Sequence, residues 1–149
     1  MGPYGIAEYD VRLKADTQDF NFMMGWFEDP TSNGFNAATQ VALNLRFSLN
    51  GVTANNGVRT ENLATLQADK WYKVRITLDN NFEEYSAVVT DVETGKVVGS
   101  LLDAAYQASI PSGVTGIKTT CWGYIRGHTY DFDLTNVTIG KSDTKYSAQ

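Results

Sequence analysis

The chain has little of what crosslinks, anchors or activates a protein. Its 149 residues include one cysteine and one histidine. Cys121 cannot form an internal disulfide, and we expect a buried, unreactive thiol, because free cysteines are usually buried and a nucleophile needs a nearby base. The sequence has no run of about 18 apolar residues, so no membrane partner is expected. No charged and then apolar leader follows Met1, and we expect any targeting segment to lie outside this sequence.

Positive charge is also scarce. Twelve basic residues are outnumbered by seventeen acidic ones, which gives a net charge of −5 and a pI near 4.7. Affinity for phosphate chains depends on a positive field, so this composition argues against nucleic acid as a partner. A chain of this length can bury roughly two-thirds of its unfolded surface in one core. We expect a monomeric single domain over residues 1–140 and a polar tail or linker remnant over residues 141–149.

What the sequence has in abundance is alternation. Apolar and polar residues alternate with a period of two in segments such as 6–14 and 41–49, which is typical of half-buried β-strands. Asn50-Gly51 after the second of these is a strong hairpin signal. The expected strands cover residues 6–14, 20–27, 41–49, 52–54, 71–79, 84–91, 96–101, 117–126 and 130–139. With one helical turn at 102–109, this pattern predicts an all-β fold, a two-sheet antiparallel β-sandwich of the jelly-roll type.

Residues 117–126 form the most informative of these expected strands. Alternation places Ile117, Cys121 and Ile125 on one apolar face, while the other face carries a Trp, a Tyr and two cations. Burying two unpaired cations is costly, so we expect this second face to lie outside the core; an aromatic face turned into the core is the alternative. Aromatic rings stack on sugars and cations bind carboxylates. The predicted ligand-binding platform consists of Lys118, Trp122, Tyr124 and Arg126.

Outward-facing polar residues on two other strands extend this platform if those strands share its sheet. They are Asn44 and Arg46 on one strand and Lys73 and Arg75 on another. Converging cations would favour an anionic sugar, because Arg can bind a uronate carboxylate through two hydrogen bonds. The alternative is an ordinary solvated surface.

Carboxylates on the first and last strands suggest a metal site. They are Glu8 and Asp10 on the first strand and Asp131 and Asp133 at the last, which jelly rolls often place side by side. Carboxylate oxygens suit Ca²⁺, so a structural calcium ion is the expected cofactor. Charges that protect a sheet edge from pairing are the alternative.

The signals for catalysis are short. Arg59-Thr60-Glu61 resembles one motif of alginate-lyase jelly rolls, but the Gln-x-His and Tyr-rich motifs that accompany it there are absent. A catalytic pair would require His128 with Tyr124 or Tyr130, whereas a lone histidine in a turn is more often solvated. We therefore expect no enzymatic activity.

Segment 66–79, with a turn followed by Trp71-Tyr72 and an alternating strand, resembles the concanavalin A-like and laminin-G-like jelly rolls, as do segments 85–95 and 130–139. Within these it is most similar to non-catalytic carbohydrate-binding modules of bacterial plant-cell-wall enzymes, including pectin-binding ones. The resemblance implies a secreted module that binds a polysaccharide, holds structural calcium and is joined to catalytic or cell-surface modules of a larger parent polypeptide. The alternatives are a small jelly-roll lyase or hydrolase and a structural or adhesive sandwich without a sugar ligand.

Overall fold

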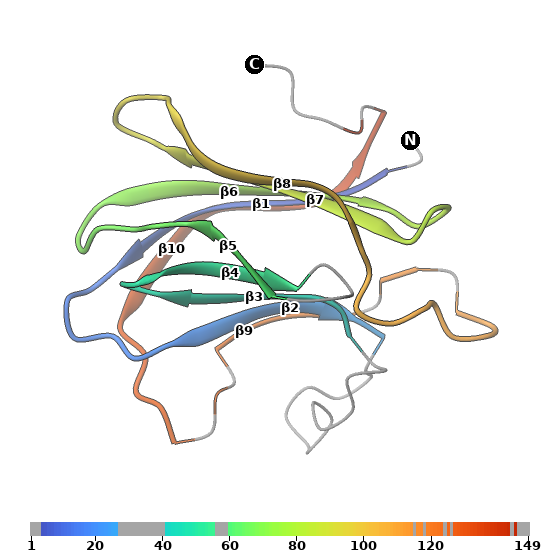
Figure 1. Cartoon of the computed structure of the whole chain (residues 1–149), viewed down its shortest axis with the longest axis horizontal. Coiled ribbons are helices and arrows are strands. Elements are labelled where there is room, and N and C mark those ends of the chain that lie inside the picture. Colours follow the sequence, from blue (N-terminus) through green and yellow to red (C-terminus); the bar gives the residue numbers. More distant parts are fainter. Residues whose placement is uncertain are drawn as a thin grey trace.

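The fold is a sandwich of two antiparallel sheets, as predicted, and its strand order fits a jelly roll (Figure 1). The computed structural model describes residues 4–26, 41–55, 60–114, 116–117, 119–123, 125, 127–143 and 145. These residues form ten strands and no helix. Within this described part there is accordingly no helix of the length and apolar character needed to cross a membrane.

Each layer contains five strands. The layer that we call the β6 sheet has the order β10-β1-β6-β7-β8, and the layer that we call the β3 sheet has the order β5-β4-β3-β2-β9. The β6 sheet consists of β1 (Tyr4–Leu13), β6 (Trp71–Asp79), β7 (Glu84–Asp91), β8 (Val97–Ala105) and β10 (Phe132–Ser142). The β3 sheet consists of β2 (Phe20–Gly25), β3 (Val41–Ser48), β4 (Gly51–Asn55), β5 (Thr60–Ala64) and β9 (Thr119–Gly123).

The core lies between the layers and follows the predicted alternation. On β1, for example, Tyr9, Val11 and Leu13 are completely buried, whereas Arg12, between Val11 and Leu13, is partly exposed. The Tyr9 ring meets rings from the opposite layer, at centroid distances of 5.0 Å to Phe22 and 6.4 Å to Phe47. Burying such a side chain is worth roughly 1.5–3 kcal/mol. Aromatic packing across the two layers therefore holds the sandwich together.

The hairpin predicted at Asn50-Gly51 is confirmed. Ser48 pairs with Gly51, so the two-residue loop that joins β3 to β4 is Leu49-Asn50, one residue earlier than predicted, and Gly51 begins β4. Gly51 has a φ of 142°, and a Cβ at this position would lie 2.8 Å from the carbonyl oxygen of Ala64 on β5. Only glycine fits this approach of the turn to the neighbouring strand.

The helical turn predicted at residues 102–109 is wrong. β8 continues to Ala105, and Ala104 pairs with Tyr85 on β7. Ala104 and Tyr106 are buried, and the Tyr106 hydroxyl donates a hydrogen bond to Oδ1 of Asn80 at 2.6 Å. Tertiary packing at these alternating positions outweighs the helix propensity of the Leu- and Ala-rich segment.

The last strand is longer than predicted. β10 ends at Ser142, whereas the expected strand ended at residue 139. Beyond it, the Lys145 ammonium lies 2.9 Å from an Asp103 carboxylate oxygen and 3.5 Å from one of Asp79. Part of the segment predicted to be a polar tail therefore packs against the β6 sheet.

Candidate functional site

The predicted orientation of the aromatic platform is wrong. β9 pairs with β2, and the residue directly opposite Trp122 is Phe22, a core residue. Opposed residues on paired strands point to the same side of a sheet, so Trp122 faces the interior. Its ring lies 4.9 Å from that of Phe22 and 5.3 Å from that of Tyr9. The other predicted platform residues, Lys118, Tyr124 and Arg126, lie outside the described residues.

Cys121 correspondingly lies on the face opposite to the predicted one. It pairs with Met23 and packs with Met23 and Val41 in a small cluster apart from the main core. Burial raises the pKa of its thiol. Because the thiolate is the reactive form, this shift fits the unreactive thiol expected from the sequence.

The outer face of the β3 sheet carries polar side chains aligned in two rows across its strands. Strand pairing aligns one row composed of Asn62, Thr53, Arg46 and Asn21. Two residues further along each strand, the second row is polar at Thr60, Asn55 and Asn44 and ends at the apolar Met23. With strands about 4.8 Å apart, a row across four strands is about 14 Å long. This face is polar over a length that suits an extended ligand.

A hollow of about 400 Å³ lies on this face. Its lining residues are Asn21, Asn44, Arg46, Thr53, Asn55, Thr60 and Gln107. The first six come from the adjacent strands β2 to β5, and Gln107 follows β8, where its backbone N–H donates to the Ala42 carbonyl oxygen at 2.7 Å. Two of the predicted site residues, Asn44 and Arg46, are thus brought together in one hollow. The other five were missed, although polar residues at outward positions, such as Asn21 between two core phenylalanines, are the signal that marks them.

Amide groups dominate this hollow. The Oδ1 atoms of Asn21 and Asn44 are buried, and neither has a hydrogen-bond partner within the described part of the chain. An unsatisfied buried acceptor costs about 1–3 kcal/mol. These two oxygens therefore favour water or a ligand that supplies O–H or N–H donors. The backbone of Asn55 is held from the interior of the sandwich, because the Tyr85 hydroxyl of the β6 sheet donates a hydrogen bond to its carbonyl oxygen.

The cation in this hollow is paired with a carboxylate. The Nε atom of Arg46 donates to Oδ2 of Asp19 at 3.2 Å, and Nη2 lies 3.2 Å from the same oxygen. Both side chains are largely solvated, so the pair is weak, but it offsets the positive charge at the edge of the hollow. The hollow is consequently a hydrogen-bonding surface more than a charged one.

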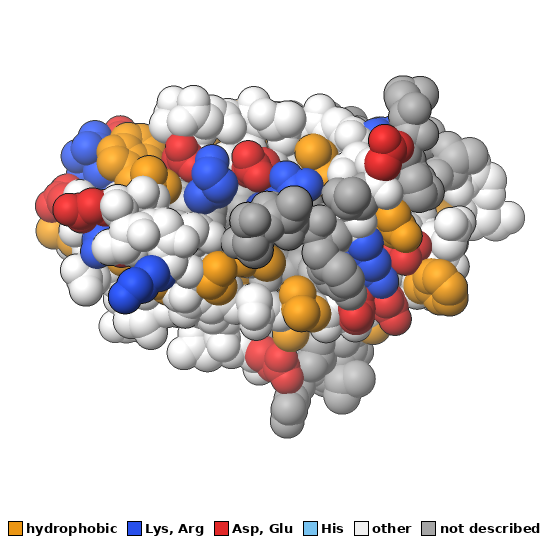
Figure 2. All heavy atoms as spheres, turned by 90° about the horizontal axis from the view of Figure 1, so that it is seen from above, with side chains coloured by type: hydrophobic (Ala, Val, Ile, Leu, Met, Phe, Trp, Pro, Cys, Tyr) orange, Lys and Arg blue, Asp and Glu red, His pale blue; other side chains and the backbone are white. Residues whose placement is uncertain are grey.

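Lys73 and Arg75 do not extend this surface, because β6 belongs to the other sheet. On its outer face, Nζ of Lys73 lies 3.0 Å from Oδ1 of Asp10, and Nη1 of Arg75 lies 2.9 Å from Oε2 of Glu8. Figure 2, seen from the side of the β6 sheet, shows basic and acidic side chains next to one another there. This face neutralises its own charges.

The four carboxylates predicted to bind calcium do not fit a metal centre. β1 and β10 are neighbours, as expected. However, Glu8 and Asp10 bind the cations of β6, and Arg12 donates to Oδ2 of Asp133 at 2.8 and 3.0 Å. That hydrogen bond holds the pKa of Asp133 below its ordinary value, whereas a hydrogen bond with Asp16 raises the pKa of Asp131. Across the described ranges, no three His, Cys, Asp or Glu side chains are placed to share a metal ion.

The residues considered for catalysis have structural partners. Nδ1 of His128 lies 2.7 Å from the Asp19 carbonyl oxygen. The Tyr130 hydroxyl bonds to the backbone N–H and carbonyl of Ile125. Tyr124, the other tyrosine considered as a partner of His128, lies outside the described residues. In the motif similar to that of alginate lyases, Arg59 also lies outside them, and Thr60 lines the hollow. The described atoms therefore do not assemble a His–Tyr pair free to act on a substrate.

Comparisons with known proteins bear on the fold. No protein-family model matches the chain, and no curated protein matches it. A solved structure of a sialidase is similar, with a TM-score of 0.58 and 15% identity over 95% of this chain, which spans 14% of the length of that protein. A Scytalido-glutamic peptidase bound to a peptide-based transition-state analog aligns with a TM-score of 0.47 and 7% identity, over 97% of this chain and 78% of that one, too low to carry an argument. The likeness to the sialidase shows that this chain shares a β-sandwich fold with part of a much longer protein.

Proposed function

We propose that the protein is a non-catalytic carbohydrate-binding module whose site is the hollow on the outer face of the β3 sheet. The observation that carries this proposal is the composition of the hollow, in which four amides, two hydroxyls and one guanidinium converge. Sugar hydroxyls donate and accept hydrogen bonds, and amide side chains do both as well. A polyhydroxylated ligand therefore fits these groups better than an apolar one.

A neutral glycan fits this hollow better than an acidic one. Arg46 is paired with Asp19, and the cations Lys73 and Arg75 lie on the other sheet in their own ion pairs. A uronate would have to compete with Asp19 for Arg46. The sequence left a neutral and an acidic ligand open, and an acidic one such as pectin required those cations together. Their separation favours a neutral polysaccharide.

Binding at this hollow rests on hydrogen bonds rather than ring stacking. None of its seven described lining residues is aromatic, and Trp122 packs in the interior. The Oδ1 atoms of Asn21 and Asn44 are buried and unpaired, so each would gain a donor from a sugar hydroxyl once its amide turns that oxygen toward the hollow. One such bond is worth about 0.5–1.5 kcal/mol, or about two- to tenfold in affinity.

Two observations support the proposal of a module without catalytic activity. His128 and Tyr130 are tied to backbone groups. The similar sialidase is about seven times longer than the aligned region, since the chain spans 14% of it, and this supports a role as one module of a larger polypeptide. In that role the module would hold an attached enzyme or cell surface at a polysaccharide outside the cell.

A panel of neutral and acidic polysaccharides, each cast in a native gel, tests this function. We expect a neutral polymer to retard the wild-type protein, with about the same retardation in low salt and in about 0.5 M salt, where charge effects are screened. Asn44→Ala should reduce the retardation, and Thr138→Ala on the exposed outer face of the β6 sheet is the matched control.

Three results would contradict the proposal. If no polymer retards the wild-type protein, the result would favour the structural or adhesive sandwich without a sugar ligand. Retardation of Asn44→Ala equal to that of the wild-type protein would show that the binding site lies outside this hollow. New reducing ends or unsaturated products would show the lyase or hydrolase that the sequence left as an alternative.

A further inference from the structure

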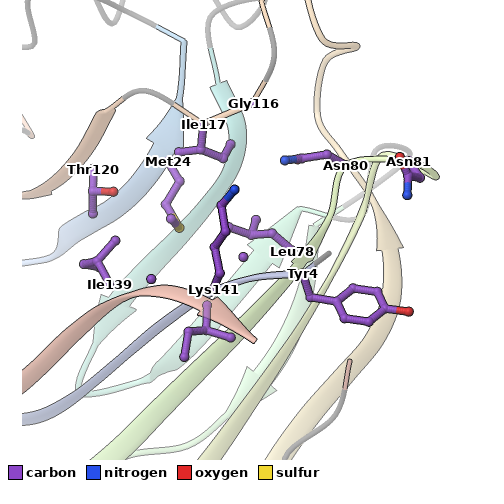
Figure 3. A pocket seen from close by; sticks show the side chains of 13 residues that line it. Tyr4, Met24, Leu78, Asn80, Asn81, Gly116, Ile117, Thr120, Ile139 and Lys141 are labelled. Carbon is purple, nitrogen blue, oxygen red and sulfur yellow. The ribbon is translucent and has the colours of Figure 1, made fainter. Parts of the chain in front are cut away.

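The sandwich is open between its layers at one end, where a second hollow of about 560 Å³ lies (Figure 3). Apolar side chains from both layers line it, with Leu78 and Ile139 from the β6 sheet and Met24 and Ile117 from the side of the β3 sheet. This hollow lies between the layers, whereas the hollow proposed to bind glycans lies on an outer face. The two are separate sites.

The unequal lengths of the edge strands explain this opening. β10 contains eleven residues, and β9 at the corresponding edge of the other sheet contains five. Ile139 pairs with the completely buried Ala7 and so faces inward, yet 52% of its surface is exposed. An inward-facing isoleucine with this exposure lacks the packing partners that the interior normally supplies.

A lysine lies among these apolar residues. Lys141 pairs with Gly5, two positions along from the pair of Ala7 and Ile139, so its side chain leaves β10 on the inward side. Figure 3 shows the Lys141 side chain extending into the hollow, which Ile117 also lines. Lys141 makes no ion pair with any residue in the described part of the chain.

A second donor projects into the same space. Oδ1 of Asn80 accepts the hydrogen bond from Tyr106, which leaves the amide NH₂ directed toward the hollow (Figure 3). A Cβ on Gly116 would lie 3.1 Å from this nitrogen, so the glycine leaves room for it. One ammonium and one amide NH₂ thus face a hollow whose other side chains are mainly apolar.

We propose that this hollow binds a small amphipathic carboxylate. The carboxylate accepts hydrogen bonds from Nζ of Lys141 and Nδ2 of Asn80, and the hydrocarbon chain packs against Met24, Leu78 and Ile139. The charge selects the anion, because a charge-assisted hydrogen bond is roughly twice as strong as a neutral one. Burial of the chain supplies the remaining affinity, at about fourfold for each CH₂ group fully removed from water.

Titration with octanoate and with 1-octanol, followed by NMR of methyl-labelled methionines, tests this proposal. Met23 and Met24 are adjacent but face opposite sides of β2, so one is an internal control for the other. We expect octanoate to shift the Met24 methyl saturably, to leave Met23 unchanged, and to bind more tightly than octanol.

Two lysine variants then locate the charge. Lys141→Met keeps an apolar stem and should weaken octanoate binding about tenfold or more, with octanol binding unchanged. Lys96→Met is the matched control, because Lys96 lies in the turn between β7 and β8 at the opposite end of the sheet. Thermal unfolding confirms that both variants fold.

Several outcomes would overturn the proposal. They are no saturable shift of Met24, equal affinity for octanoate and octanol, and unchanged octanoate affinity in Lys141→Met. The last result would reduce Lys141 to a charge that protects an exposed sheet edge from pairing with another chain. A failure here leaves the glycan site untouched, since the gel assay measures the outer face of the β3 sheet.

Discussion

Truncation of Trp122 distinguishes a core residue from a ligand platform. In the structure its ring packs on Tyr9 and Phe22, and it belongs to the interior of the sandwich. Trp122→Ala is therefore expected to reduce folding stability rather than to remove a sugar contact. A ligand platform would behave in the opposite way, with weaker binding and nearly unchanged stability.

The size of the loss follows from the packing. Replacing a core Phe or Trp by Ala costs about 3–5 kcal/mol, and Trp122 belongs near the lower limit because its surface is only partly buried. Its two ring contacts account for about 0.5–1.5 kcal/mol each beyond the buried area. With a urea m-value of about 2 kcal/mol/M, a loss of about 3 kcal/mol lowers the unfolding midpoint by about 1.5 M.

Trp71→Ala provides the matched control. Trp71 is also partly buried, but it faces outward from β6, where the Arg12 guanidinium lies 4.7 Å from its ring centroid. An exposed cation–π contact is worth about 0.5–1 kcal/mol, so this variant should lose far less stability. Urea unfolding of both variants, with glycan retardation of the folded proteins, measures the difference. The interior assignment fails if Trp122→Ala is no less stable than Trp71→Ala and has lost glycan retardation.

The remaining predictions concern close backbone contacts and pH. A Cβ on Gly99 would lie 1.8 Å from the Leu63 carbonyl oxygen, so Gly99→Ala should cost about 1–3 kcal/mol in urea unfolding, whereas Gly140→Ala meets no atom within 4 Å and should be nearly neutral. The hydrogen bond from Arg12 lowers the pKa of Asp133, so its contribution to stability is present above the unfolded-state pKa of about 4 and is lost as pH falls through the lower folded value; Asp133→Asn should destabilise at about pH 7 and match wild type in strong acid. The hydrogen bond with Asp16 raises the pKa of Asp131, so its contribution to stability is present below about pH 4 and is lost as pH rises through the raised value. Relative to wild type, Asp131→Asn should therefore be less stable at about pH 3 than at about pH 7.

Strands with one clearly apolar face were predictable from the sequence. In β1 and β6 every inward position is apolar, so a shift by one residue would expose the whole set and the register is strongly specified. Asn50-Gly51 indicated the position of one hairpin, although its loop is Leu49-Asn50 and the need for glycine at 51 also comes from the approach to Ala64 on β5. Alternation and turn residues are both recognised from neighbouring positions in the sequence, so the strands and the hairpin position that depend on them could be predicted.

The face of β9 was not predictable in the same way. Cys121 and Trp122 are both apolar and adjacent, so period-two alternation offers two faces without saying which is buried. The cations used to choose between them, Lys118 and Arg126, lie outside the described residues, of which Thr119–Gly123 form the strand. What decides the face is pairing with Phe22 on β2, and this contact spans about a hundred residues of chain.

The same long-range pairing separates the two outer faces chemically. Arg46, Lys73 and Arg75 all occupy outward strand positions, but Lys73 and Arg75 meet Asp10 and Glu8, which are 63 and 67 residues away in sequence. A ligand binding there would have to break ion pairs that already satisfy those cations. On the β3 sheet it would meet amides and hydroxyls, two of whose oxygens lack partners among the described residues. Hydrogen-bonding ligands of low charge therefore gain more at the β3 sheet than at the β6 sheet, whose greater number of cations would suggest the reverse.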